Sequence, residues 1–119
     1  MARRPGRIWV ADVAERSMEP ALLPGDRLLV LPAGPGGLPC LRGTPPVGSI
    51  VIVDRAGRFD VKRVAPPPPG VSDLWLLGDN AERSRDSRHD GALPLSALRG
   101  RVIYRIGPRG RRGRISAVR

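Results

Sequence analysis

Three short segments combine turn-forming residues with side chains that can move protons. Ser17 lies in SMEPALLPGD, where a proline three residues further on favours a turn that presents the hydroxyl. Lys62 lies in FDVKRV, whose alternation is typical of a strand. The third segment, GDNAERSRDSRHDG at 78–91, carries hydroxyl, carboxylate and guanidinium groups among turn residues. A hydroxyl and an amine are the groups that a serine nucleophile and its general base require.

Each segment, taken singly, also has an ordinary structural interpretation. A serine in a turn most often caps it by accepting a hydrogen bond from a nearby N–H. Alternation places Lys62 on the same strand face as Asp60, so it could be an exposed strand lysine. The loop at 78–91 could be a solvated loop in which Asp86 pairs with Arg88. Only the three segments together favour the catalytic interpretation.

Lys62 is the single lysine among 21 basic residues, and all the others are arginine. An arginine keeps its proton in a protein, whereas a buried lysine can lose it. Chemistry that requires a neutral amine would therefore exclude arginine from this position. The alternative is chance, because a strong bias towards arginine leaves few lysines anywhere in the chain.

The formal net charge is +10 over 119 residues, which raises the question of a nucleic acid or an anionic membrane as partner. The charge is concentrated at the ends, since residues 1–9 and 105–119 contain arginines and no acidic residue. Between them the sequence is nearly neutral, and aromatic residues, on which bases would stack, make up only 3%. We therefore expect no nucleic-acid partner, while the basic tail could contact a membrane surface.

The elements that must position these residues are short strands. Gly and Pro, at 15 and 14 residues, argue against long helices. Residues 94–98 favour a helical turn, and residues 32–47 and 65–70 form Pro/Gly-rich loops. Residues 54–58, with their glycine, separate the third and fourth strands as a hairpin connection would. The expected fold is mainly β, a small antiparallel β-sheet domain with at most one short helical turn. Alternation and β-branched residues predict six strands, at residues 8–14, 27–31, 49–53, 59–64, 74–77 and 101–106.

Together the segments resemble, in order and in spacing, the motifs of the type I signal peptidases (peptidase family S26), serine endopeptidases with a Ser–Lys dyad on a β fold. SMEPALLPGD is similar to their nucleophile motif. GSIVIV at 48–53 is similar to their central strand, with Ser49 where an aspartate is usual. VKRV at 61–64 is similar to the general-base motif, and 78–91 to the last motif. The likeness covers about residues 8–106.

The resemblance implies a catalytic role for two residues. Ser17 would be the nucleophile, and its backbone N–H one donor to the oxyanion. Lys62 would be the general base. That role requires burial to lower its pKa, because at the ordinary value of about 10.4 almost every lysine is charged at pH 7. The substrate would be a precursor protein or peptide from which a signal peptide or propeptide is cleaved, and no cofactor or metal is expected.

The resemblance also implies five supporting residues. Ser84 would hydrogen-bond and orient the lysine amine, while Asp86 and Arg88 would form a structural ion pair in the same loop. Met18 and Pro20, which follow the nucleophile, would contact substrate. These roles extend the predicted site over the turn that carries the nucleophile and the loop at its far side.

Two residues depart from the family pattern beside the nucleophile. Glu15 stands where a small residue that helps to bind the oxyanion is common, and Arg16 stands in place of glycine. A carboxylate disfavours a nearby oxyanion unless it points away or pairs, and Arg16 is the candidate partner. The identity of the second oxyanion donor is therefore open.

The expected organisation is a catalytic signal-peptidase-like domain at 8–106, preceded by a basic extension at 1–7 and followed by a flexible basic tail at 107–119. The apolar runs are too short to span a membrane, so we expect a cytoplasmic or peripherally membrane-associated chain without the family's anchor. Cys40 is the single cysteine, which excludes an intramolecular disulfide.

Other functions share parts of this pattern. One variant is a small anchorless relative, similar to the proteases that mature nickel superoxide dismutase. LexA-like self-cleaving regulators also use a Ser–Lys dyad, but no helix-turn-helix pattern precedes Ser17. A non-catalytic basic domain that binds nucleic acid would use the arginines alone, and it predicts steep salt dependence of binding.

Overall fold

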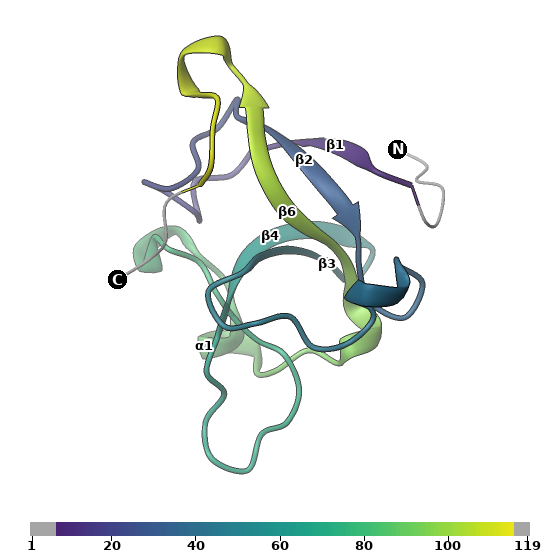
Figure 1. Cartoon of the computed structure of the whole chain (residues 1–119). Coiled ribbons are helices and arrows are strands. Elements are labelled where there is room, and N and C mark those ends of the chain that lie inside the picture. The colour runs from purple at the N-terminus through teal and green to yellow at the C-terminus, as the bar shows by residue number, and fades with distance from the viewer. Residues whose placement is uncertain (1–6, 116–119) are drawn as a thin grey trace.

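A computed structural model describes residues 7–115 of the chain. Its six strands form one antiparallel sheet in the order β1-β2-β6-β3-β4-β5 (Figure 1). The six predicted strands and the mainly β fold are thereby confirmed, with ends that differ by up to three residues. The strands are β1 (Trp9–Asp12), β2 (Arg27–Pro32), β3 (Ile50–Arg55), β4 (Arg58–Ala65), β5 (Trp75–Leu77) and β6 (Leu98–Gly107).

Strand β3 lies in the middle of the sheet and is buried on both faces. Ile50 and Ile52 contribute to one apolar cluster, whereas Val51 and Val53 contribute to a second one. Successive side chains of a strand point to opposite faces, so the uninterrupted run IVIV serves both clusters at once. The second cluster lies on the face of the sheet that carries Lys62, because Val51 is the cross-strand partner of Lys62.

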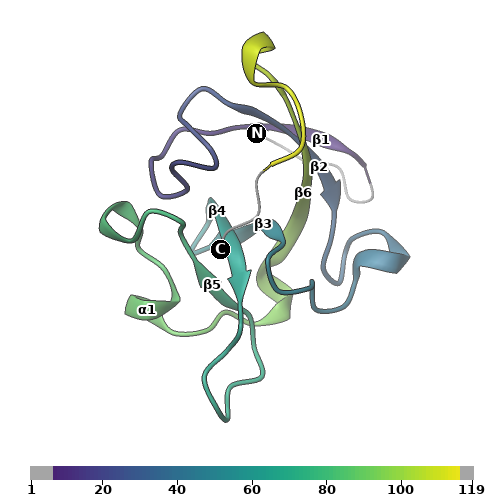
Figure 2. The same ribbon diagram turned by 60° about the vertical axis from the view of Figure 1, so that its left-hand side comes forward.

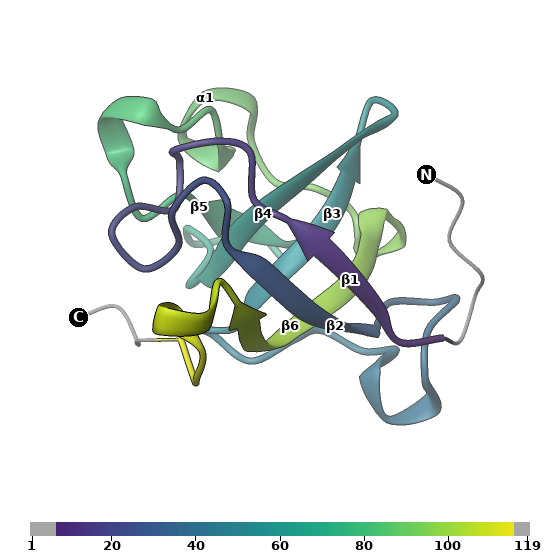
Figure 3. The ribbon, with the colours of Figure 1, turned by 90° about the horizontal axis from the view of Figure 1, so that it is seen from above.

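The sheet curls, so that β1 approaches β4 although the two strands are far apart in its order. The rings of Trp9 and Phe59 lie 5.7 Å apart, and Figure 3 shows β1 crossing over β4. Trp9 and Val61 also pack against the same apolar cluster. The curl places the turn that follows β1 over the middle of β4.

Strands β3 and β4 form a hairpin around Ala56 and Gly57, which have φ angles of 54° and 83°. Positive φ at both central residues is typical of the two-residue turns that match strand twist. The predicted hairpin connection is confirmed. Its register places Lys62 opposite Val51 and Asp60 opposite Val53, so both polar side chains emerge on one face of β4.

Helical structure is limited to single turns. The turn expected at 94–98 is a 3-10 turn at Leu95–Ala97. The loop that follows β5 contains the α-helical turn α1 (Ser87–Asp90), which lies beside β5 (Figure 2). Asp86 caps α1, since its side chain accepts a hydrogen bond from the backbone N–H of Arg88. Further 3-10 turns occupy Pro39–Leu41, Ala81–Arg83 and Arg109–Arg111.

The basic segment after β6 differs from the flexible tail predicted for 107–119. Arg111 donates to the buried carboxylate of Asp26 at 2.8 Å, and the backbones of Gly113 and Arg105 pair with each other. A buried carboxylate is costly without a partner, so Asp26 holds the segment against the domain. The basic composition of the segment suggested disorder. The ion pair could not be foreseen from composition, because its two residues lie 85 positions apart in the sequence.

Ile115 continues this packing, because it lies against the apolar cluster of β1 and β2. Residues 116–119 of the predicted tail and residues 1–6 of the predicted extension lie outside the described residues. None of the helices in the described chain has the length and apolar composition needed to cross a membrane.

Candidate active site

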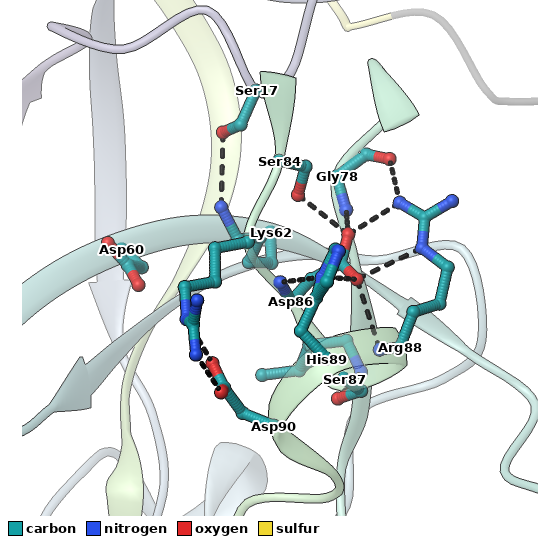
Figure 4. A network of polar contacts seen from close by, with 12 residues as sticks. Ser17, Asp60, Lys62, Gly78, Ser84, Asp86, Ser87, Arg88, His89 and Asp90 are labelled. Carbon is teal, nitrogen blue, oxygen red and sulfur yellow. Dashed lines mark hydrogen bonds and ion pairs between the residues drawn. The ribbon is translucent and has the colours of Figure 1, made fainter. Parts of the chain in front are cut away.

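Ser17 and Lys62 meet in the structure, although 45 positions separate them in the sequence. The amine Nζ of Lys62 donates a hydrogen bond to Oγ of Ser17 at 3.1 Å (Figure 4). Both residues are only 6% exposed. The structure thus brings together the two groups that the sequence nominated, within the distance over which a proton can pass.

The turn that carries Ser17 is fixed by the loop after β5. The backbone N–H of Asn80 donates to the carbonyl of Ser17 at 2.8 Å, and the Asn80 side-chain amide reaches the carbonyl of Arg16. Gly78 lies between this turn and Ser84. A Cβ on Gly78 would come within 2.6 Å of the Ser17 carbonyl oxygen and 2.2 Å of the Ser84 hydroxyl. Only glycine permits this approach.

The surroundings of Lys62 lower the affinity of its amine for a proton. Burial lowers the pKa of its amine below the ordinary lysine value, and the positive charges of Arg55 and Arg58 act in the same direction. The carboxylates of Asp60 and Asp86 oppose this effect and raise the pKa. The balance of these contributions is a lowered pKa, as a general base at neutral pH requires.

Asp86 and Arg88 form the ion pair that the sequence predicted. Nη2 of Arg88 lies 2.6 Å from one carboxylate oxygen, and Nε lies 3.0 Å from the other. The same carboxylate accepts hydrogen bonds from Ser84 Oγ at 2.6 Å and from Gly78 N–H at 2.8 Å (Figure 4). Burial alone would raise the pKa of Asp86, but these hydrogen bonds outweigh it and hold the pKa well below its usual range.

Ser84 lies in the site but differs in its contact from the expectation. Its hydroxyl hydrogen is donated to Asp86, and a hydroxyl has only one hydrogen to give. Towards Lys62 it could therefore act only as an acceptor. His89 closes the cap of α1, because its side chain accepts a hydrogen bond from the Asp86 N–H.

Of the two residues predicted to contact substrate, one lines the cleft beside the site and the other does not. Met18 is buried and lines a cleft of about 470 Å³ that opens beside Ser17 and Lys62. Pro20 is exposed, and the lining of this cleft, as far as the structure describes the chain, does not include it. The cleft is lined by charged and apolar side chains alike: Asp12, Val13, Ala14, Glu15, Ser17, Met18, Arg55, Arg58, Phe59, Asp60, Val61, Lys62, Arg83 and Arg85.

Glu15, the residue that departs from the family pattern, is 69% exposed at its side chain. It lies 3.6 Å from Arg58, whereas Arg16 pairs with Glu19 at 3.0 Å. The suggested partner Arg16 is therefore wrong, and a residue from β4 replaces it. The pair with Arg58 reduces the repulsion that a carboxylate would exert on an oxyanion at Ser17.

Two ion pairs near the site, each with a buried carboxylate, were not recognised in the sequence. Arg63 binds both carboxylate oxygens of Asp79, at 3.0 and 2.8 Å, and so ties β4 to the loop after β5. Arg55 lies 2.8 Å from the carboxylate of Asp60. The alternation that places Asp60 and Lys62 on one strand face could be read from the sequence. The arginine that pairs with Asp60 from across the hairpin could not, because it depends on the register of the two strands.

Among the described residues, no group of three or more His, Cys, Asp or Glu side chains could hold a metal ion. Cys40 is exposed and distant in the chain from the site. The site itself offers a shielded hydroxyl beside an amine with a lowered pKa.

No family model matches the chain. A short stretch is 46% identical over 35 residues to mitochondrial inner membrane protease subunit 1 of Mus musculus, which is 29% of this chain and 21% of that protein. It is 42% identical over 38 residues to the subunit 1 of Homo sapiens, covering 32% of this chain and 23% of that protein.

A plant protein gives a match of the same kind. The mitochondrial ATP-independent inner membrane protease subunit 1a of Arabidopsis thaliana is 43% identical over 35 residues, or 29% of this chain and 21% of that protein. The matches thus span less than a quarter of the length of these relatives. They support kinship with a peptidase family, in agreement with the resemblance to the type I signal peptidases.

Proposed function

We propose that this chain is a serine endopeptidase in which Ser17 is the nucleophile and Lys62 the general base. The observation that carries the proposal is the 3.1 Å hydrogen bond between these two buried side chains. The short similarity to protease subunits supports the same class of activity.

The reaction follows from the contact. The neutral amine of Lys62 takes the hydroxyl proton as Ser17 Oγ attacks the carbonyl carbon of the scissile peptide bond. The tetrahedral intermediate collapses, the C–N bond breaks, and Lys62 returns the proton to the leaving amine. The same amine then activates a water molecule that hydrolyses the acyl-enzyme and frees Ser17.

The backbone N–H of Ser17 is the proposed oxyanion donor. Within the described chain this N–H has no hydrogen-bond acceptor of its own, so it is free to bind the developing negative charge. An N–H that is held by the turn before the substrate arrives requires no rearrangement when charge develops.

The proposed substrate is a segment of a precursor protein, cleaved to remove a signal peptide or a propeptide. The cleft of about 470 Å³ is open to solvent along β4 and the turn after β1, as an extended peptide requires. The relatives that support this proposal are named as subunits of an inner membrane protease.

Covalent labelling tests the proposal. The purified protein, treated with a penem that acylates signal peptidases, should gain the mass of one acyl group, and peptide mapping should place it on Ser17. Ser17→Ala and Lys62→Met should both prevent the adduct, whereas Ser72→Ala, a matched change at an exposed serine, should not. An adduct that persists in Ser17→Ala would overturn the assignment of the nucleophile.

A further inference from the structure

A carboxylate lies unexpectedly close to the proposed base. Asp60 is 6% exposed and precedes Lys62 by two residues on the same face of β4, and both line the cleft (Figure 4). A negative charge in such a place favours the protonated amine and so works against a general base. A general base at this position therefore requires positive charge close to the Asp60 carboxylate.

Arg55 supplies most of this positive charge at short distance. Its Nη2 lies 2.8 Å from Oδ2 of Asp60, and Arg58 Nε lies 3.6 Å from Oδ1. The two arginines are cross-strand partners at the end of the β3–β4 hairpin, so the turn itself places both guanidinium groups near the carboxylate. Arg55 is held in turn by Asp90, at 2.7 Å. The negative charge beside Lys62 is thus matched by positive charge from the hairpin end.

We propose that Asp60 and Arg55 form a positioning pair that sets the pH range over which Lys62 can act as a base. The inference rests on the proposed function of Lys62, but the pair itself is visible in the structure without it. The charge of Asp60 favours the protonated amine, and Arg55 limits this effect by pairing with the carboxylate.

The other carboxylates around Lys62 have arginine partners of their own. Asp86, from the loop before α1, is bound by Arg88, and Glu15, at the mouth of the cleft, is paired with Arg58. The remaining charged side chains of the cleft on this side are Arg83 and Arg85, of which Arg85 pairs with Asp90, and Asp12, which pairs with Arg27. The pair of Asp60 and Arg55 is therefore the arrangement whose change alters the charge beside the amine most directly.

Removing either partner should shift the pKa of Lys62, and the two shifts should be opposite in direction. In Asp60→Asn the carboxylate is lost while Arg55 remains, so the pKa of Lys62 should fall. In Arg55→Gln the carboxylate is left less compensated, so the pKa of Lys62 should rise. The double variant should lie between the two single variants. A purely structural role would move both single variants in the same direction, or not at all.

Nuclear magnetic resonance can read this directly, because Lys62 is the only lysine in the sequence. Protein grown with isotope-labelled lysine gives one side-chain signal, whose titration reports the pKa of this amine without any assay of activity. We expect shifts of at least about 0.5 pH unit, downwards for Asp60→Asn and upwards for Arg55→Gln. Asp54→Asn, which changes a carboxylate on the same hairpin that pairs with Arg99, is the matched control and should not shift it.

Titrations of both single variants that coincide with that of the unchanged protein would overturn the inference. Either variant alone suffices if the other fails to fold, because each has its own predicted sign. The acylation of Ser17 separates the two claims. If the adduct forms but the pKa of Lys62 does not shift in the variants, only the role of the positioning pair is refuted. If the pKa shifts but no adduct forms, the role of the pair stands and the proposed function is refuted.

Discussion

Lys62 owes its proposed chemistry to its position between two charged networks. Arg55 and Asp60 lie on one side of it, and Asp86 with Arg88 on the other. Burial makes the charged amine costly, while the ion pairs prevent either carboxylate from stabilising it fully. An arginine at this position would remain charged under the same burial, which gives the single lysine of the sequence a physical reason.

The sequence identified Ser17 and Lys62 because motif order and spacing are local properties that can be read along the chain. It could not show that the Ser84 hydroxyl turns to Asp86, or that Glu15 pairs with Arg58. The first contact depends on the conformation of the loop after β5, and the second on the curl of the sheet, which brings the turn after β1 over β4.

Gly78→Ala tests how tightly the site is packed. The added Cβ would meet the backbone oxygen of Ser17, which cannot rotate away, and the Ser84 side chain. Displacement of the nucleophile by a fraction of an ångström should slow acylation of Ser17 by about tenfold or more, measured by the rate of penem adduct formation. Gly43→Ala, at a glycine with open space around it, should leave this rate unchanged. Equal rates in the two variants would show that Gly78 does not fix the turn.

Among the elements, the hairpin of β3 and β4 determines the site more than any other. It places Lys62 and Asp60 on one face and brings Arg55 across to them. The sequence predicted the hairpin from alternation and its glycine. It could not predict that Ala56 takes a positive φ, which for a residue with a Cβ is uncommon.

Ala56→Asn should stabilise the hairpin. The φ of 54° at Ala56 is unfavourable for alanine and is well tolerated by asparagine, and Asn-Gly is the preferred pair for such a turn. We expect a gain of about 0.5–1 kcal/mol in the free energy of unfolding, measured with urea. Gly57→Ala, at a φ of 83°, should destabilise the protein. Loss of stability in Ala56→Asn would contradict this account of the turn.

The segment that follows β6 is the element that the sequence described least well. Its arginines suggested disorder, yet Arg111 and Arg105 surround Asp26, whose side chain is buried. Asp26 also accepts the backbone N–H of Leu23 and thereby closes the turn before β2. One carboxylate therefore joins the turn before β2 to the segment after β6, a long-range contact that composition cannot reveal.

Asp26→Asn should cost about 2–3 kcal/mol of unfolding free energy, because it leaves Arg105 and Arg111 facing a neutral side chain in a buried place. Urea denaturation measures the change. Asp12→Asn makes the same replacement in the exposed pair with Arg27 and should change stability by less than about 1 kcal/mol. Similar effects of the two substitutions would show that the segment after β6 is not held by Asp26.

For the whole molecule, the net charge of +10 takes on a different meaning. The arginines of the basic tail that lie within the described residues are partly engaged in ion pairs and backbone contacts of the fold, as Arg111 with Asp26 and Arg112 with the carbonyl of Ile106. A membrane contact through the tail stays a prediction, and it would draw on those basic groups that remain exposed.

Acid should destabilise the molecule in a defined range. Burial raises the pKa values of Asp26 and Asp86, but hydrogen bonds from their arginine partners outweigh it, so both pKa values lie below the ordinary 3.8 in the folded protein. Their contribution to stability is complete above the unfolded value and is lost as the pH falls towards the lowered one. The urea midpoint should therefore hold steady from about pH 7 to about pH 5 and decline below about pH 4. A midpoint that rises on acidification would contradict these ion pairs.

The central claim is that a buried, neutral Lys62 activates Ser17. The rate at which a penem acylates Ser17, followed by intact mass from about pH 5 to about pH 9, tests it most directly. The account predicts an adduct on Ser17 whose rate rises with pH as Lys62 loses its proton and then levels off, with no adduct in Lys62→Arg that keeps its fold. An adduct on another residue, or one that forms in Lys62→Arg at the rate of the unchanged protein, would contradict it.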